Sequence, residues 1–121
     1  MSQFVRLLAG VVALALATVM TACSLREPLD ASGATIVDVR TPGEYAAGHL
    51  QGAINIDIYA ADFGALIAAL PKDATYIVYC RSGVRSADAV AQMKAAGLSD
   101  VIDAGGYQNA SKSTGLPIVT S

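Results

Sequence analysis

The chain alternates segments typical of β-strands with segments that have the periodicity of helices. Strand-like runs rich in β-branched residues lie at Thr35–Val39, Ala53–Ile56, Thr75–Tyr79 and Asp100–Asp103. Strands separated by helices are joined by crossovers and run in the same direction. The alternation therefore predicts an α/β fold with a mostly parallel central sheet flanked by helices. A chain of 121 residues without internal repeats has room for one such domain.

Two of the predicted helices lie on either side of the third strand. The first has a single apolar face formed by Phe63, Leu66, Ile67 and Leu70, with Asp62 placed to cap its start and Pro71 to end it. The second runs from about Val84 to Ala96 and stops at Gly97. Its predicted inward side consists of Val84, Ala87, Val90 and Ala91.

The N-terminus has the pattern of an export signal. Fourteen residues from Leu7 to Met20 carry no charge, which is fewer than the roughly 20 needed to span a bilayer. The following Met20-Thr21-Ala22-Cys23 resembles the lipobox of bacterial lipoproteins, in which the cysteine is diacylated. We therefore expect a signal peptide at 1–22, a lipidated Cys23 with a tether at 23–33 and a folded domain at 34–121. An uncleaved membrane anchor and a soluble secreted protein are the alternatives.

This interpretation places the protein outside the cytoplasm, anchored to a membrane and facing the periplasm. The mature chain would carry seven Lys or Arg and ten Asp or Glu, a side-chain net charge of −3. An acidic chain without a basic cluster argues against nucleic acid as a partner. With Cys23 acylated, Cys80 is the only free thiol, so a disulfide within the chain is excluded. A small buried hydrophobe is the alternative role for Cys80.

The neighbours of Cys80 favour a reactive thiol. Cys80 directly follows the third predicted strand and Arg40 closely follows the first, so both belong to the carboxyl edge of the sheet, where sites form. The next residues lead into a helix whose first N–H groups lack intrahelical partners. These donors, together with Arg81 and Arg85, favour a thiolate at Cys80, for which we expect a pKa of about 6–7.5. Gly83 suits a loop that approaches a ligand closely.

Two sequence motifs, and the order in which they follow each other, resemble those of the rhodanese-like sulfurtransferases. The first is DVRTPGEY (residues 38–45), followed by GHLQGAINI (48–56), and the second is CRSGVR (80–85). The resemblance runs from about Asp30 to Gly106. It implies that Cys80 takes a sulfane sulfur from a donor such as thiosulfate, holds it as a persulfide and passes it to a thiol or protein acceptor. It implies no metal or organic cofactor. The donor would be bound by the remaining loop residues, Arg81, Ser82, Gly83, Val84 and Arg85.

Two other functions of this loop remain as alternatives. Phosphatases built on the same fold place five residues between their Cys and Arg, whereas four separate Cys80 from Arg85, which leaves less room and fewer N–H donors. Phosphatase or arsenate reductase chemistry is therefore the less favoured alternative. A persulfide carrier or sensor without turnover is the other, since it needs the same nucleophile.

The upstream motif also has a structural explanation. Thr41 and Glu44 fit a capping box with Pro42 at the first helical position, and Gly48 could end this helix in a left-handed conformation. His49 lacks partners at metal-ligand spacing, so we expect it to hydrogen-bond within the turn.

Asp38 and Arg40 are expected to form an ion pair that supports the active edge, with contact between Arg40 and an anionic donor as the alternative.

The chain also departs from the family pattern near its end. Ala110 stands where many members carry Trp after a Gly-Gly pair, which predicts a thin or open wall beside the active loop.

Overall fold

A four-stranded parallel sheet forms the centre of the computed structural model, which describes residues 28–120. The spatial order of the strands is β3-β1-β4-β5, and each neighbouring pair is parallel. This arrangement confirms the α/β fold predicted from the sequence. The elements follow one another as β1 (Thr35–Asp38), α1 (Pro42–Ala47), β2 (His49–Leu50), β3 (Ile54–Asn55), α2 (Phe63–Ala68), β4 (Thr75–Cys80), α3 (Val84–Ala95), β5 (Asp100–Gly106), α4 (Tyr107–Thr114) and β6 (Ile118–Val119).

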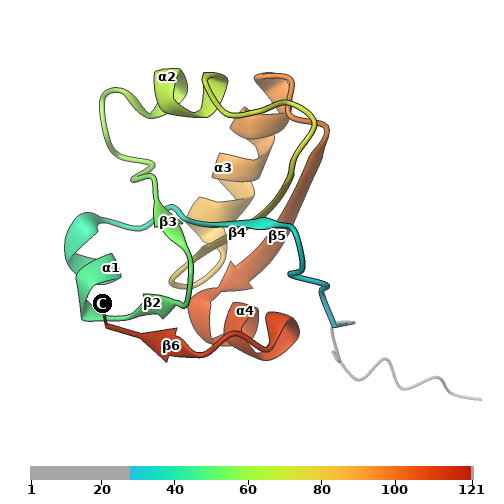
Figure 1. Ribbon diagram of the computed structural model, residues 1–121. Helices are drawn as coiled ribbons and strands as arrows, with labels where there is room; N and C mark the ends of the chain where they lie inside the picture. Colours follow the sequence, from blue (N-terminus) through green and yellow to red (C-terminus); the bar gives the residue numbers. More distant parts are fainter. Residues whose placement is uncertain (1–27, 121) are drawn as a thin grey trace, which may run out of the picture.

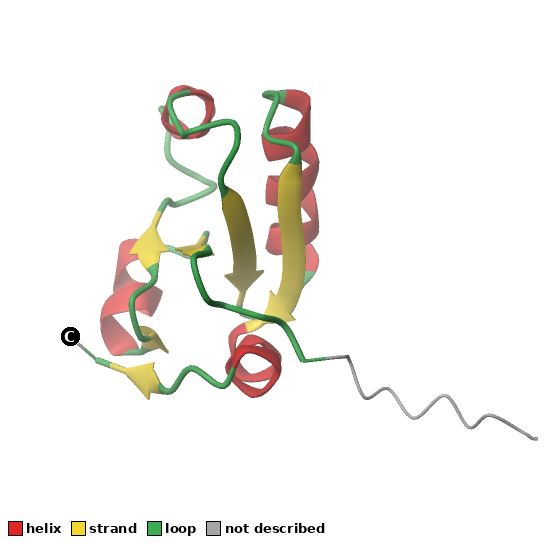
Figure 2. Ribbon diagram, turned by 45° about the vertical axis from the view of Figure 1, so that its right-hand side comes forward, coloured by secondary structure: helices red, strands yellow, loops and turns green. Residues whose placement is uncertain are grey.

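Both faces of the sheet are covered. Because successive side chains of a strand point to opposite sides, one strand contributes to the core on each face. On β4, Val78 and Cys80 pack in the cluster that includes residues of α2 and α3. Ile77 and Tyr79 pack in the other cluster, which includes residues of α4 and β2. In Figure 1, α2 and α3 occupy the upper part of the molecule and α1, α4, β2 and β6 the lower part. Figure 2 shows the same separation from another side.

The inward side of α3 differs from the prediction. Its buried residues are Ser86, Ala89, Val90 and Met93, so only Val90 of the predicted set faces the core. Val84 is 77% exposed, because the helix begins at the sheet's edge and its first residue projects beyond the core. The hydrophobic pattern did not predict this face, because Ser86 is polar and yet lies inward, where its hydroxyl contacts Gly83 O and Cys80 Sγ.

Three local predictions also need correction. Asp62 makes no side-chain capping bond to α2; the chain enters that helix through a turn in which Phe63 N–H donates to Ala60 O. Leu66 is 43% exposed, whereas Phe63 and Ile67 of the same predicted face are buried. Gly48 ends α1 at φ 158° and ψ 134°, which is close to extended backbone rather than the left-handed helical conformation.

Neither the C-terminal helix α4 nor the small antiparallel sheet of β2 and β6 was predicted from the sequence. In the segment YQNASKST, only Gln, Ala and Lys are strong helix formers. It is stabilised instead by contacts within the folded chain. Asn109 Nδ2 donates to Ala104 O, and Thr114 Oγ1 donates to Ala110 O.

Residues that precede the predicted start of the domain at residue 34 also pack against it. Leu29 N–H donates to Ser113 O at 2.7 Å, and Leu29 and Ala31 pack against the cluster beside α4. Cys23 and the predicted signal peptide at 1–22 lie outside the described residues. Among residues 28–120, no helix has the length and apolar character that crossing a membrane requires.

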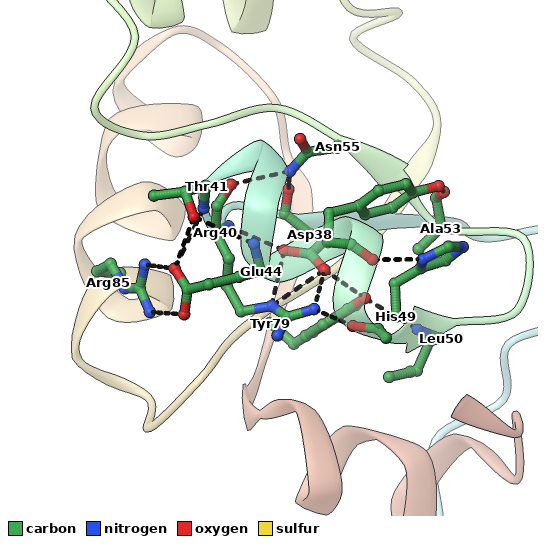
Figure 3. A network of polar contacts seen from close by, with 12 residues as sticks. Asp38, Arg40, Thr41, Glu44, His49, Leu50, Ala53, Asn55, Tyr79 and Arg85 are labelled. Atoms are coloured by element: carbon green, nitrogen blue, oxygen red, sulfur yellow. Dashed lines mark hydrogen bonds and ion pairs between the residues drawn. The ribbon is translucent and has the colours of Figure 1, made fainter. Parts of the chain in front are cut away.

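A buried polar network joins the elements at the carboxyl edge of the sheet (Figure 3). Asp38, which has no exposed surface, accepts hydrogen bonds from the Arg40 backbone N–H and from its guanidinium group. The predicted ion pair is therefore present, with 2.7 Å between Arg40 Nη2 and Asp38 Oδ2. Arg40 Nη2 also donates to Gly48 O. Asn55 Nδ2 donates to the carbonyls of Asp38 and Arg40, which ties β3 to the same corner.

Tyr79 connects this network to β4 and β2. Its hydroxyl donates to Asp38 Oδ2 at 2.7 Å and accepts from Leu50 N–H at 3.0 Å. Burial, reinforced by the bond to Asp38, raises the pKa of Tyr79, so the hydroxyl stays protonated as a donor.

We predict that Tyr79→Phe lowers the free energy of unfolding by about 1–3 kcal/mol, because it leaves the buried Leu50 N–H unpaired and removes one donor from Asp38. Urea denaturation at neutral pH measures this loss. Tyr76→Phe is the matched control, since the Tyr76 hydroxyl makes a single bond, to Pro71 O. Equal losses for the two variants would contradict the role given to Tyr79.

Candidate active site

Cys80 is the last residue of β4 and has no exposed surface. Its Sγ accepts a hydrogen bond from Gly83 N–H at 2.9 Å, across the loop that joins β4 to α3. The Ser86 hydroxyl lies 3.5 Å from Sγ and donates to Gly83 O at 3.0 Å. Because a hydroxyl can rotate, Ser86 can accept from the thiol or donate to the thiolate.

These contacts set the acidity of Cys80. Burial raises the pKa of the thiol, but hydrogen bonds from the Ser86 side chain and from the backbone N–H groups of Ser86, Gly83 and Ser82 outweigh it. The net pKa lies below its ordinary value, in the direction that the sequence predicted. The backbone N–H donors that the sequence indicated contribute as expected, whereas the strongest of the lowering causes, the Ser86 side chain, was not predicted.

Arg85 is engaged elsewhere. Its guanidinium forms a two-pronged ion pair with Glu44, with Nη1–Oε1 at 2.7 Å and Nη2–Oε2 at 3.0 Å. The guanidinium also lies 5.8 Å from the centre of the Tyr59 ring. The bond from Arg85, helped by Thr41, lowers the pKa of Glu44 to about 2. Arg85 thus ties the start of α3 to α1.

Glu44 has two structural tasks, of which the sequence showed only one. The predicted capping box is present, since Glu44 N–H donates to Thr41 Oγ1 and Glu44 Oε1 accepts from Thr41 N–H. The pairing with Arg85, 41 residues away in the chain, could not be read from local spacing. His49 Nδ1 lies 2.8 Å from Tyr45 O, so it hydrogen-bonds within the turn as expected. In residues 28–120, no group of three metal-ligating side chains was found.

Two glycines of β5 support the active loop. A Cβ atom at Gly106 would lie 2.6 Å from Arg81 O, so any side chain there would push the loop away. Gly105 has a positive φ of 73°, which favours glycine. Gly83 has a φ of 107° and would meet Gly105 Cα at 3.7 Å if it carried a Cβ. The Gly-Gly pair therefore allows the backbone of β5 to lie directly behind the loop.

The remaining loop residues face solvent. Arg81 and Ser82 are exposed, and Val84 projects from the first turn of α3. Arg81 lines a cavity of about 220 Å³ together with Arg40, Glu44, Ala47 and Tyr107. Ala110, at the position where many family members carry Trp, is fully buried in the core, and Tyr107 lines the cavity.

Sequence reasoning missed Ser86, Tyr79 and Tyr107. Ser86 stands three residues after Gly83, so the first helical turn brings its hydroxyl back over the loop; this spacing was the available signal. Tyr79 looked like an ordinary core residue of a strand. Tyr107 belongs to α4, which the sequence did not predict.

We predict that Ser86→Ala raises the pKa of Cys80, because it removes the hydroxyl while leaving the backbone donors of the loop. The rate of iodoacetamide alkylation measured against pH reports this pKa. Ser82→Ala is the control, since Ser82 acts through its backbone N–H and its side chain is exposed. An unchanged alkylation midpoint in Ser86→Ala would contradict the role of the hydroxyl.

Known proteins resemble this chain over most of its length. The sulfurtransferase of Allochromatium vinosum is 34% identical over 90 residues, which cover 74% of this chain and 82% of that protein. The thiosulfate sulfurtransferase GlpE of Pseudomonas fluorescens is 41% identical over 68% of this chain and 74% of its own length. The probable adenylyltransferase/sulfurtransferase MoeZ of Mycobacterium tuberculosis is 40% identical over 69% of this chain. The chain spans only 21% of MoeZ.

Solved structures and a family model agree with these relatives. A rhodanese with anions from E. coli has a TM-score of 0.60 and 33% identity, covering 73% of this chain and 99% of that one. A rhodanese-related protein from Thermoplasma volcanium has a TM-score of 0.62 and 29% identity, covering 79% of this chain and all of that one. The rhodanese-like domain model matches residues 21–113. The chain therefore belongs to the rhodanese family and contains a single rhodanese-like domain.

Proposed function

We propose that the protein is a sulfurtransferase that moves a sulfane sulfur from thiosulfate, or a donor like it, to a thiol acceptor through a persulfide on Cys80. The observation that carries this proposal is the hydrogen bonding of Sγ by Gly83 N–H and Ser86, which favours a thiolate despite burial. The names of the sulfurtransferase relatives support it.

In the first step, the Cys80 thiolate attacks the outer sulfur of thiosulfate. A new S–S bond forms on Cys80, the S–S bond of thiosulfate breaks, and its electron pair leaves with sulfite. The loop N–H groups that stabilise the thiolate are also placed to stabilise negative charge on the bound outer sulfur. Arg81, which is exposed and follows Cys80 directly, is the residue best placed to attract the anionic donor.

In the second step, the thiolate of the acceptor attacks the outer sulfur of the persulfide. A new S–S bond forms on the acceptor, and the bond between the two sulfurs of the enzyme breaks to return the Cys80 thiolate. Each step exchanges one S–S bond for another, so the cycle consumes no oxidant or reductant. It also uses no metal or organic cofactor.

The short loop favours this chemistry over phosphoryl transfer. Four residues separate Cys80 from Arg85, and the Arg85 guanidinium is paired with Glu44. A cysteine phosphatase needs donors around three phosphate oxygens, whereas a single sulfur atom needs only the few N–H groups that the loop presents.

We predict that Cys80→Ser reduces thiosulfate-dependent turnover to below about 1% of wild type, because an alcohol is a far weaker nucleophile than a thiolate near neutral pH. Steady-state release of sulfite, with dithiothreitol as the acceptor, measures the activity. An aryl phosphate serves as the competing substrate. Turnover that survives in Cys80→Ser, or phosphate hydrolysis that rivals sulfur transfer in the wild type, would contradict the proposal. Loading of Cys80 without turnover would identify a carrier.

We also propose that the protein is exported and held at a membrane by lipid on Cys23, facing the periplasm. Its support is the sequence alone: an uncharged run of signal-peptide length, followed by Met20-Thr21-Ala22-Cys23. Two acyl chains anchor a protein stably, whereas one holds it only marginally.

We predict that the full chain, expressed in an export-competent bacterial cell, sediments with membranes and that Cys23→Ser abolishes processing or releases the protein. Cell fractionation with immunodetection measures both effects. Cys80→Ser is the control, because it removes the other cysteine without touching the proposed lipidation site. Wild-type protein found wholly in the soluble fraction would contradict the proposed anchor.

A further inference from the structure

Two adjoining cavities form a trough beside the active loop. The first, of about 220 Å³, is lined by Arg81, and the second, of about 290 Å³, by Gly48, Gln108 and Ile118. They share Arg40, Glu44, Ala47 and Tyr107, so they are parts of one depression, called here the Arg40 trough. It lies between α1 and α4 and reaches from the active loop towards β6.

Arg40 presents one free nitrogen to this trough. The side chain is only 5% exposed, and its Nε and Nη2 are occupied by Asp38 and Gly48 O. Among residues 28–120, no hydrogen bond involves Nη1. Every fully buried side-chain nitrogen or oxygen in that part of the chain has a partner, so Nη1 keeps some exposed surface, and Arg40 lines both cavities of the trough. It is a charged donor without a partner among residues 28–120, on a side chain that its other hydrogen bonds hold in place.

Tyr107 adds a wall and a second donor. Its ring lies 5.0 Å from the Arg40 guanidinium carbon, and the Tyr79 ring lies 5.7 Å from the same atom. The two rings restrict the guanidinium plane. The Tyr107 hydroxyl makes no hydrogen bond within residues 28–120, and it too is left for solvent or a ligand.

The charges in the trough favour an anion. Asp38 neutralises Arg40, and Glu44 is occupied by Arg85 and Thr41. Arg81 forms no ion pair with any residue of the described part of the chain. The trough therefore holds one uncompensated positive charge beside the free Arg40 Nη1.

The sheet separates this trough from the nucleophile. Tyr79 and Arg40 lie in contact on one face, whereas Cys80 packs in the core cluster on the opposite face. An anionic group in the trough can reach Cys80 only around the carboxyl edge of the sheet, beside Arg81. In thiosulfate the outer sulfur is bonded directly to the anionic group, so this donor suits two positions on opposite faces of the sheet poorly. A thiol with several bonds between its sulfur and its anionic group is longer and suits them better.

We propose that the Arg40 trough binds a carboxylate of the sulfur acceptor, and that the acceptor is a carboxylate-bearing thiol of small-peptide size. This inference rests on the proposed sulfur transfer. The carboxylate accepts from Arg40 Nη1 and the Tyr107 hydroxyl and is attracted by Arg81, while the thiolate attacks the outer sulfur of the Cys80 persulfide. That sulfur passes to the acceptor, and Cys80 leaves as the thiolate.

The test adds negative charge to the trough in the full chain. Gln108→Glu keeps the size of an exposed lining residue, and Ala47→Asp introduces a carboxylate at the end of α1. Ala46→Asp is the matched control, because Ala46 is also exposed on α1 but does not line the trough. The acceptors are glutathione, its diethyl ester, which masks the carboxylates, and uncharged dithiothreitol.

We expect Gln108→Glu and Ala47→Asp to raise the KM for glutathione roughly three- to tenfold, because a like charge stands a few ångströms from the bound carboxylate. The KM values for the ester and for dithiothreitol should not change, and Ala46→Asp should change none of the acceptor KM values. Equal effects on charged and uncharged acceptors, or no preference of the wild type for glutathione over its ester, would overturn the proposal.

A binding measurement keeps this result separate from the proposed function. S-methylglutathione cannot accept sulfur, and in ¹⁵N-resolved NMR it should shift the amide signals of Ala47, Tyr107 and Gln108 in the wild type but not in Gln108→Glu. Shifts without any turnover would support the trough and refute the sulfur transfer. Turnover with dithiothreitol but no shifts at these amides would refute the trough alone.

Discussion

The buried carboxylate of Asp38 is the constraint on which the active edge of this domain depends. A carboxylate without exposed surface is stable only when it is paired and hydrogen-bonded on all sides. Its partners come from separate parts of the chain: Arg40 just after β1 and Tyr79 on β4. Through these two residues it also reaches Gly48 and Leu50. The first β-strand, the turn after α1 and the strand that carries Cys80 are thereby fixed relative to one another.

The nucleophile then depends on backbone geometry more than on nearby charge. Gly105 and Gly106 let the active loop lie directly on β5, and Gly83 takes a positive φ so that its N–H points at Sγ. Arg85 contributes by tying α3 to α1 through Glu44, which keeps the loop's end in place. The chain thus separates the task of holding the loop from the task of stabilising the thiolate. Arg81 is left exposed to meet ligands.

Much of this arrangement could be predicted from the sequence, because its signals are local. The alternation of strands and helices, the capping box of Thr41 and Glu44 and the position of Cys80 at the end of a strand all arise from spacing within a few residues. The features that were missed depend on contacts between distant segments. Pairing of Glu44 with Arg85 spans 41 residues, and α4 is held by side chain to backbone bonds rather than by helix propensity. Ser86 is polar and yet buried, because its hydroxyl donates to Gly83 O of the folded loop, a contact that the sequence pattern does not show.

The central claim is that Cys80 itself carries the transferred sulfur, and the mass of the protein tests it most directly. The full chain is incubated with thiosulfate, freed of excess donor and measured intact, and the peptide that contains Cys80 is then sequenced by mass spectrometry. The account predicts a gain of one sulfur atom, located on Cys80 and lost on addition of a thiol acceptor. An unchanged mass, or added sulfur located on another residue, would contradict it.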